Sequence, residues 1–139
     1  MALRRDAKVE LLKNAPLFAE CSKSELRALA SSADELDLRE GTVITREGRA
    51  GREFFVLIEG TARVTKNGKT VAQLGPGDWF GEIALLTNSP RTATVTATSA
   101  VDVLVITDRS FRRTVETMPS IALKILSSVG DRLARDIKS

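Results

Sequence analysis

The stretch that decides the expected fold reads Gly75-Pro-Gly-Asp-Trp-Phe-Gly-Glu-Ile-Ala-Leu-Leu-Thr-Asn-Ser-Pro-Arg-Thr-Ala-Thr94. Within a short distance it combines a glycine, Gly81, an acid, Glu82, a short apolar turn and a lone arginine, Arg91. Glycine lets a backbone approach a ligand closely, and a short helix start offers free N–H groups to an anion. Arginine presents a planar fork of donors to phosphate oxygens, and a carboxylate accepts hydrogen bonds from sugar hydroxyls. The stretch therefore indicates a site for a phosphate group that carries a sugar.

The order of these residues resembles the phosphate-binding cassette of cyclic nucleotide-binding domains. In that family, Phe-Gly-Glu is followed by apolar residues, a short loop, and then Pro-Arg, a small residue and Ala. This chain has Phe80-Gly-Glu82 and, after the loop, Pro90-Arg-Thr-Ala93. The resemblance implies that the cassette, residues 80–94, binds a cyclic nucleoside monophosphate.

The resemblance also implies a role for each residue of the cassette. Arg91 is expected to bind the phosphate, and Glu82 is expected to accept a hydrogen bond from the ribose 2′-hydroxyl. Further contacts are expected to the phosphate from Ala84, Thr92 and Ala93, and to the ribose from Gly81 and Ile83. The alternatives are a surface arginine at Arg91, and at Glu82 an acid that meets the positive end of a short helix.

The choice of base is expected to depend on Thr92. In kinase members of the family, threonine at this place accompanies cGMP and alanine accompanies cAMP, but threonine also occurs in members that respond to cAMP. We therefore expect cAMP as the ligand, with cGMP as the alternative. Trp79 either stacks on the base or fills the interior of the domain, and packing is the simpler interpretation.

A second stretch, Glu47-Gly-Arg-Ala-Gly-Arg-Glu-Phe-Phe-Val-Leu-Ile-Glu-Gly60, is similar to the family's glycine-rich landmark. The family often has an acid directly after the second glycine, and this acid pairs with the arginine that binds phosphate. Here that position is Arg52, and Glu53 comes next. The link between the cassette and this hairpin therefore depends on whether Glu53 replaces the usual acid.

Composition excludes several classes of function. The chain has 139 residues, 42% hydrophobic and 28% charged, which is typical of one globular domain. It has no histidine and a single cysteine, so a zinc site of the usual kind and a histidine-dependent nucleophilic triad are excluded. We expect a binding protein without catalytic or metal-ligating residues and without a cofactor. We also expect it to be cytoplasmic, because no signal sequence or membrane-spanning run is present.

The order of helical and strand-like sequence patterns along the chain predicts an α+β fold that is mainly β. Helical patterns occupy 1–33, with a capping box at Ser22 to Glu25 that starts a helix through Ala33. Glycine-punctuated apolar runs follow over 34–107, and Asn67-Gly68 is typical of a two-residue hairpin turn. The strands are expected at 35–39, 42–45, 53–59, 61–66, 69–74, 78–80, 92–98 and 101–106. The resemblance identifies them as an eight-stranded antiparallel β-roll of jelly-roll type.

Two helices are expected over 108–139. The first runs from Asp108 to about Glu116, and the second follows Pro119 to the C-terminus. The second carries one apolar stripe: Ile121, Ala122, Ile125, Leu126, Val129, Leu133 and Ile137. We expect these helices to close over the ligand, with Leu126, Val129 and Leu133 as lid residues against the base. The alternatives are a permanently docked helix and a homodimer seam through 120–137.

The expected function is that of a cyclic nucleotide sensor that passes a signal to a protein effector not identifiable from the sequence. One alternative is the sensor half of a transcription regulator of the catabolite activator type without its DNA-binding module, which would begin where the chain ends at Ser139. Others are a regulatory domain of a kinase or channel, and a degenerate roll without ligand. Basic residues outnumber acidic ones over 109–139, but no run of like charges occurs. We therefore expect no sequence-specific DNA binding and no membrane partner.

Overall fold

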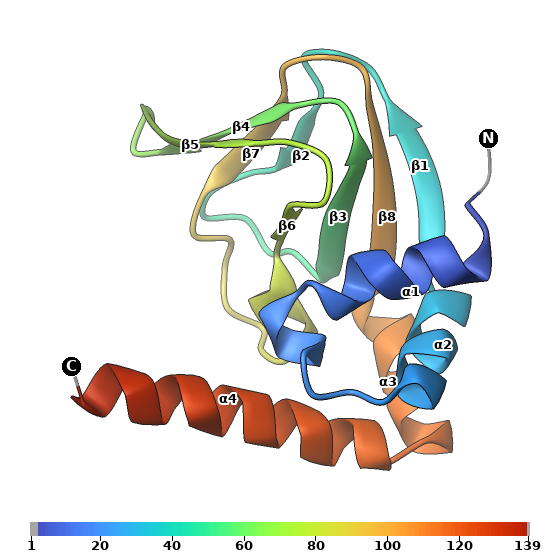
Figure 1. Cartoon of the computed structure of the whole chain (residues 1–139). Coiled ribbons are helices and arrows are strands. Elements are labelled where there is room, and N and C mark those ends of the chain that lie inside the picture. The colour runs from blue at the N-terminus through green and yellow to red at the C-terminus, as the bar shows by residue number, and fades with distance from the viewer. Residues whose placement is uncertain (1–2, 139) are drawn as a thin grey trace. The chain divides into compact units, whose positions relative to one another are not determined.

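The computed structural model describes residues 3–138, with side chains through Arg135. The chain divides into two compact units (Figure 1). The β unit is Ala33–Asp108, and the helical unit combines Met1–Ser32 with Arg109–Ser139. Each unit is described by itself below.

Residues 33–108 form eight strands in two four-stranded antiparallel sheets. One sheet has the order β1-β8-β3-β6 and the other β2-β7-β4-β5 (Figure 1). The strands are β1 (Asp34–Leu38), β2 (Val43–Thr45), β3 (Glu53–Glu59), β4 (Ala62–Lys66), β5 (Lys69–Leu74), β6 (Trp79–Phe80), β7 (Thr94–Ala97) and β8 (Val101–Thr107). This arrangement confirms the predicted fold class and β-roll. The largest difference from the expected bounds is at β7, which begins at Thr94 rather than at residue 92.

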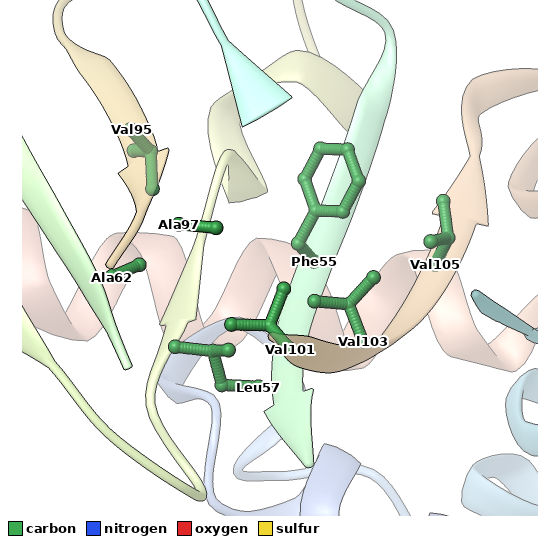
Figure 2. Packing of buried hydrophobic residues seen from close by; sticks show 8 residues of the cluster. All are labelled: Phe55, Leu57, Ala62, Val95, Ala97, Val101, Val103 and Val105. Atoms are coloured by element: carbon green, nitrogen blue, oxygen red, sulfur yellow. The ribbon is translucent and has the colours of Figure 1, made fainter. Parts of the chain in front are cut away.

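The core of the β unit lies between the two sheets (Figure 2). Strand β3 contributes Phe55 and Leu57 to this core, and β4 contributes Ala62. The other members come from β7 and β8: Val95, Ala97, Val101, Val103 and Val105. Phe80 packs against this cluster, and its ring stacks on Phe55 with centroids 4.9 Å apart. The stacking fixes β6, and with it the start of the cassette, against the core.

The hairpin between β4 and β5 turns at Asn67-Gly68, as the sequence predicts. Asn67 has a φ of 53° and Gly68 a φ of 78°. Two successive residues with positive φ are the signature of a type I′ turn, whose twist matches that of the flanking strands. The antiparallel pairing of β4 with β5 follows from this reversal.

The helical unit contains α1 (Arg5–Lys13), η1 (Pro16–Phe18), α2 (Lys23–Ser31) and α4 (Ser120–Lys138). Helix α3 (Asp108–Thr117) begins at the last residue of the β unit. The capping box of α2 is confirmed, because Ser22 Oγ accepts from Glu25 N–H at 3.2 Å and Glu25 Oε1 accepts from Ser22 N–H at 2.7 Å. Helix α2 ends at Ser31, two residues before the expected Ala33. The 3₁₀ turn η1 lies between α1 and α2, within the helical pattern expected over 1–33, and was not predicted as a separate element.

Helix α4 is fixed to residues 16–25 by polar contacts over its first half. Lys124 Nζ donates to Glu25 Oε1 at 3.0 Å, in a pair whose carboxylate is buried. Ser127 Oγ donates to Glu20 Oε1 at 2.8 Å, and Ser128 Oγ donates to the Pro16 carbonyl at 2.5 Å. These contacts hold the first half of α4 in a defined register against the N-terminal segment.

Helix α4 buries only part of its predicted apolar stripe. Ile121 and Ile125 are buried as expected, but the buried face continues to the polar Ser128. Leu126 and Leu133 are exposed, with 67% and 59% of their surface accessible. The side chain of Ile137 lies outside the described residues. The buried face follows a spacing of four and then three residues, which places Leu126 on a different side of the helix.

Candidate functional site

Two cavities open within the β unit, and the cassette lines both. One has a volume of about 270 Å³ and the other about 210 Å³. They share five lining residues: Trp79, Phe80, Gly81, Arg91 and Thr92. The larger cavity is also lined by Glu82, Ile83 and Ala84, and the smaller one by Ala93. The structure thus brings every residue that was predicted for phosphate and ribose to the walls of two cavities with a shared boundary.

Gly81 starts the cassette turn in a conformation that suits glycine. Its φ is 80°, in the left-handed region. The turn continues as the 3₁₀ helix η2 (Glu82–Leu85), in which Ala84 N–H donates to the Gly81 carbonyl at 3.1 Å. Ala84 and Leu85 are buried, whereas Ile83 is exposed. The buried pair anchors the turn and leaves the Ile83 side at the surface.

Arg91 is a buried cation, with only 8% of its side chain exposed. Its Nη2 donates to the Glu53 carbonyl at 2.8 Å and lies 3.5 Å from Glu53 Oε1. The guanidinium also lies over the Phe55 ring, 5.9 Å from its centroid. Burial lowers the pKa of Arg91, and the charge of Glu53 opposes this shift. A guanidinium has five N–H donors, so this environment is suited to an anion as a further partner.

Glu53 supplies the link that the sequence left open. Its carboxylate pairs with Arg91 and also accepts a hydrogen bond from Arg52 N–H at 3.1 Å. The Arg52 guanidinium points elsewhere, since its Nη1 lies 3.8 Å from Asp108 Oδ2. The acid next to the expected position therefore takes over the pairing with the cassette arginine.

The backbone of the glycine-rich loop holds Arg91 as well. Arg91 N–H donates to the Arg49 carbonyl at 2.9 Å, and Gly48 N–H donates to the Arg91 carbonyl at 2.8 Å. Backbone contacts of this kind do not depend on a particular side-chain pattern, so they could not be predicted from the sequence. They make the loop and the cassette one continuous framework around the guanidinium.

Glu82 and Thr92 lie on the walls as expected, in different environments. Glu82 is half-buried, and its Oε2 oxygen is inaccessible to solvent. Thr92 is exposed and lines both cavities. Since Glu82 and Arg91 line the same cavity, a carboxylate and a buried cation face one small volume.

The smaller cavity has walls that the sequence analysis did not assign. They include three aliphatic residues, Val64, Leu74 and Val95, together with the buried Thr45. Thr45 Oγ1 donates to the Ala93 carbonyl at 3.3 Å, which fixes the chain as it enters β7. Alternation along the predicted strands could have placed these residues on the inner face, but not at a cavity.

Trp79 lies in the wall that both cavities share. Its backbone is paired with Val56 of β3, and its side chain is half-buried. The interpretation of Trp79 as interior packing is therefore incomplete, because the residue also borders the candidate ligand space.

The lid residues predicted on α4 belong to the helical unit, whereas both cavities belong to the β unit. Leu126 and Leu133 are exposed and Val129 is half-buried. Closure of the C-terminal helices over the ligand therefore stays a prediction.

In the part of the chain that the structure describes, no cluster of three or more histidine, cysteine or acidic side chains is suited to a metal ion. None of the described helices has the length and apolar content needed to span a membrane. Burial raises the pKa of the Cys21 thiol to about 11, so this thiol stays protonated near neutral pH.

Comparison with known proteins decides the family. Residues 35–118, more than half of the chain, match the family model of the cyclic nucleotide-binding domain. The chain belongs to this family. As a cyclic nucleotide-binding domain it is 41% identical, over 79% of its length, to a cAMP-dependent protein kinase regulatory subunit of Mycosarcoma maydis, of which the match covers 23%. The domain spans less than a third of the length of the curated regulatory subunits that it matches.

Solved structures support the same family. The N-terminal domain of a transcriptional regulator from Streptomyces coelicolor A3(2) is similar with a TM-score of 0.85 and 28% identity, over 93% of this domain and 96% of that chain. The regulatory domain of Toxoplasma gondii PKA, crystallised with cAMP, is similar with a TM-score of 0.72 and 27% identity. That match covers 97% of this cyclic nucleotide-binding domain and 50% of the Toxoplasma chain.

Proposed function

We propose that this cyclic nucleotide-binding domain is a cAMP sensor that regulates a partner protein and has no catalytic activity of its own. The observation that carries the proposal is that the buried Arg91 and Glu82 line the same cavity. A cation held away from solvent is suited to a phosphate, and an adjacent carboxylate is suited to a sugar hydroxyl. The relatives that are named cAMP-dependent support the choice of nucleotide.

The two cavities suggest how the ligand divides between them. In the larger cavity, Arg91 binds the phosphate and Glu82 accepts a hydrogen bond from the ribose 2′-hydroxyl. Ala84 and Thr92 of the same cavity contact the phosphate, and Gly81 and Ile83 contact the ribose. Ala93, which lines the smaller cavity, reaches the phosphate from that side. In the smaller cavity, the aliphatic walls receive the base. The flat faces of a purine can pack against these aliphatic side chains, whereas the polar edge of the purine must face solvent or Thr92.

Thr92 keeps cGMP as the second candidate ligand. Thr92 lines both cavities, so its hydroxyl can serve either the phosphate or an amino group of guanine. The Toxoplasma relative was crystallised with cAMP, which favours the adenine nucleotide by similarity.

The donor set favours binding over catalysis. The chain has no histidine, and the cavity pairs an arginine, which stays protonated, with a single carboxylate. General acid–base chemistry on a phosphodiester needs a group that exchanges protons near neutral pH, within reach of the reacting oxygen. The relatives named regulatory subunits agree with a non-catalytic role.

Titration calorimetry on the purified chain with cAMP, cGMP and 5′-AMP tests the proposal. We expect saturable one-to-one binding of cAMP, weaker binding of cGMP and little binding of the open monophosphate. Tighter binding of cGMP would make the domain a cGMP sensor. The absence of binding with both cyclic nucleotides would contradict the proposal and favour a degenerate roll.

The ribose contact has its own test, a cycle with a modified ligand. Glu82→Gln is expected to lower the affinity for cAMP about tenfold, because a hydrogen bond to a charged group is lost. The same variant is expected to have little further effect on 2′-deoxy-cAMP, since both changes remove the same hydrogen bond. Calorimetry on four pairs of protein and ligand measures the coupling. Glu59→Gln, an exposed carboxylate on β3, is the matched control. If the two losses add, Glu82 does not bind the 2′-hydroxyl.

The partner protein is proposed by analogy with the relatives. Regulatory subunits of a kinase imply a kinase-type effector, and the N-terminal domain of the Streptomyces transcriptional regulator implies a transcription regulator. Leu123, Leu126 and Leu133 are exposed on α4, which offers a seam for a homodimer through 120–137. Light scattering with and without cAMP distinguishes a dimer from a monomer that waits for a different effector.

A further inference from the structure

Gly51 lies next to the charged part of the Arg91 side chain. A Cβ at Gly51 would overlap the Nε and Cζ atoms of Arg91 and would lie 2.7 Å from Nη2. Carbon and nitrogen atoms that are not bonded to each other do not approach so closely in proteins. The space that a side chain at position 51 would fill is therefore the space that the guanidinium occupies.

Backbone conformation does not explain the glycine at position 51. The glycines with positive φ in the described residues are Gly41, Gly48, Gly60, Gly68, Gly77 and Gly81, and Gly51 is not among them. Alanine can adopt a negative φ without the penalty that applies in the left-handed region. The cost of a side chain at position 51 is thus the overlap with Arg91.

A second glycine, Gly81, lies close to another nitrogen of the same guanidinium. A Cβ at Gly81 would lie 2.5 Å from Arg91 Nη1 and 2.7 Å from the Glu53 carbonyl oxygen. Two glycines from separate loops therefore lie close to one guanidinium, while the Glu53 carbonyl accepts from its Nη2. A guanidinium displaced from Gly51 cannot keep this geometry, because the backbone of Gly81 and Glu53 limits its movement.

We infer that Gly51 is a positioning residue for nucleotide binding, because its lack of a side chain creates the space in which the Arg91 guanidinium is held ready for a phosphate. The inference rests on the proposed function, since it assigns to Gly51 the placement of the proposed phosphate ligand. Gly51 acts through Arg91 and needs no contact with the nucleotide.

Gly51→Ala is the direct test, and Gly75→Ala is its matched control. Gly75 has no positive φ, and a Cβ there would meet nothing within 4 Å. We expect Gly51→Ala to lower the affinity for cAMP roughly tenfold to a hundredfold, as for a disturbed hydrogen bond to a charged group. Gly75→Ala is expected to bind like the wild type. Calorimetry gives both affinities.

A melting-temperature cycle without ligand separates the overlap from a general defect of folding. Gly51→Ala is expected to lower the Tm by about 3 °C or more when Arg91 is present. In the Arg91→Ala background the new methyl group occupies the vacated space, so the loss of Tm is expected to shrink or reverse. This readout keeps the inference testable even if the single variant is too unstable for calorimetry.

The outcomes separate the inference from the proposed function. If Arg91→Ala no longer binds cAMP while Gly51→Ala binds cAMP with the affinity of the wild type, the proposed function stands and the inference is wrong. An equal loss of Tm from Gly51→Ala in both backgrounds would also overturn it, because the glycine would then serve the backbone. If Arg91→Ala binds cAMP normally, Arg91 is not the phosphate ligand and the assignment of Gly51 to nucleotide binding is wrong, although the domain still binds cAMP. If the wild type binds neither cAMP nor cGMP, the proposed function fails, whatever the melting-temperature cycle shows for Gly51 and Arg91.

Discussion

Replacement of Arg91 by leucine is expected to abolish cyclic nucleotide binding while the β unit stays folded. The guanidinium is buried, and a phosphate bound there would lose its charged partner in a site with little access to water. Truncation of one member of a buried charge pair costs about 2–5 kcal/mol. The affinity for cAMP is therefore expected to fall by roughly 30-fold to several thousandfold, measured by calorimetry.

The fold is expected to tolerate this change because leucine removes a desolvated charge. The methyl groups can pack against the Phe55 ring, which the guanidinium now covers. Circular dichroism should show a cooperative melt for the variant. Arg63→Leu is the control, since Arg63 is an exposed arginine on β4. Near-normal affinity of Arg91→Leu, with Arg63→Leu also normal, would contradict the assignment of the cassette.

Removal of the Glu25 carboxylate is expected to have the second largest effect, on stability rather than on binding. Glu25 is buried and holds both the start of α2 and Lys124 of α4. Glu25→Ala is expected to lower the free energy of unfolding by about 2–4 kcal/mol, because a buried pair is broken and a helix cap is lost. Urea denaturation measures this loss. Glu20→Ala is the matched control, since Glu20 is exposed and accepts only from Ser127 among the contacts described.

The same carboxylate predicts how stability depends on pH. Hydrogen bonds from Ser120 and from the Ser22 backbone lower the pKa of Glu25 to about 2. Because the folded pKa is depressed, this contribution is complete above the ordinary pKa near 4.5 and is lost as the pH falls toward 2. We expect about 1–3 kcal/mol to disappear over this range in the wild type. Glu25→Gln should show a flatter curve over the same range.

Asp102 makes the comparison with Glu25→Gln necessary. Burial, followed by the hydrogen bond and charge of Asp37 across the β1–β8 pair, raises the pKa of Asp102 to about 6. A raised carboxyl pKa acts in the opposite sense, with stability present at low pH and lost as the pH rises through 6. This contribution is common to wild type and variant, so their difference isolates Glu25. Identical curves would mean that the Glu25 carboxylate has the same affinity for protons in the folded and unfolded chain.

The parts of the fold that could be predicted are those with local causes. Asn67-Gly68 requires positive φ at both positions, and Ser22 with Glu25 satisfies helix donors three residues apart, so the sequence alone predicts both features. The cassette was predictable because its glycine, acid and arginine keep a fixed spacing. Membership of the family, which the resemblance suggested, is confirmed by the match over residues 35–118.

The features that could not be predicted depend on partners far apart in the chain or on backbone atoms. Glu25 and Lys124 are separated by 99 positions, so nothing local indicates a buried pair. Arg91 is also held by the backbone carbonyl of Glu53. Every residue has such a carbonyl, so only the folded path of the chain determines which one accepts from the guanidinium. The burial of Ser128 could not be foreseen either, because the bond from its hydroxyl to the Pro16 carbonyl joins residues 112 positions apart.

The position of Trp79 gives the molecule a reporter of its own. The chain has one tryptophan and no tyrosine, so its near-ultraviolet emission comes from a single indole. That indole borders both cavities, where the arrival of a ligand changes the polarity and the quenching groups around it. Occupancy of the site can therefore be followed by intrinsic fluorescence, without a dye or a label, and the unmodified chain can serve as its own sensor in a screen of nucleotides.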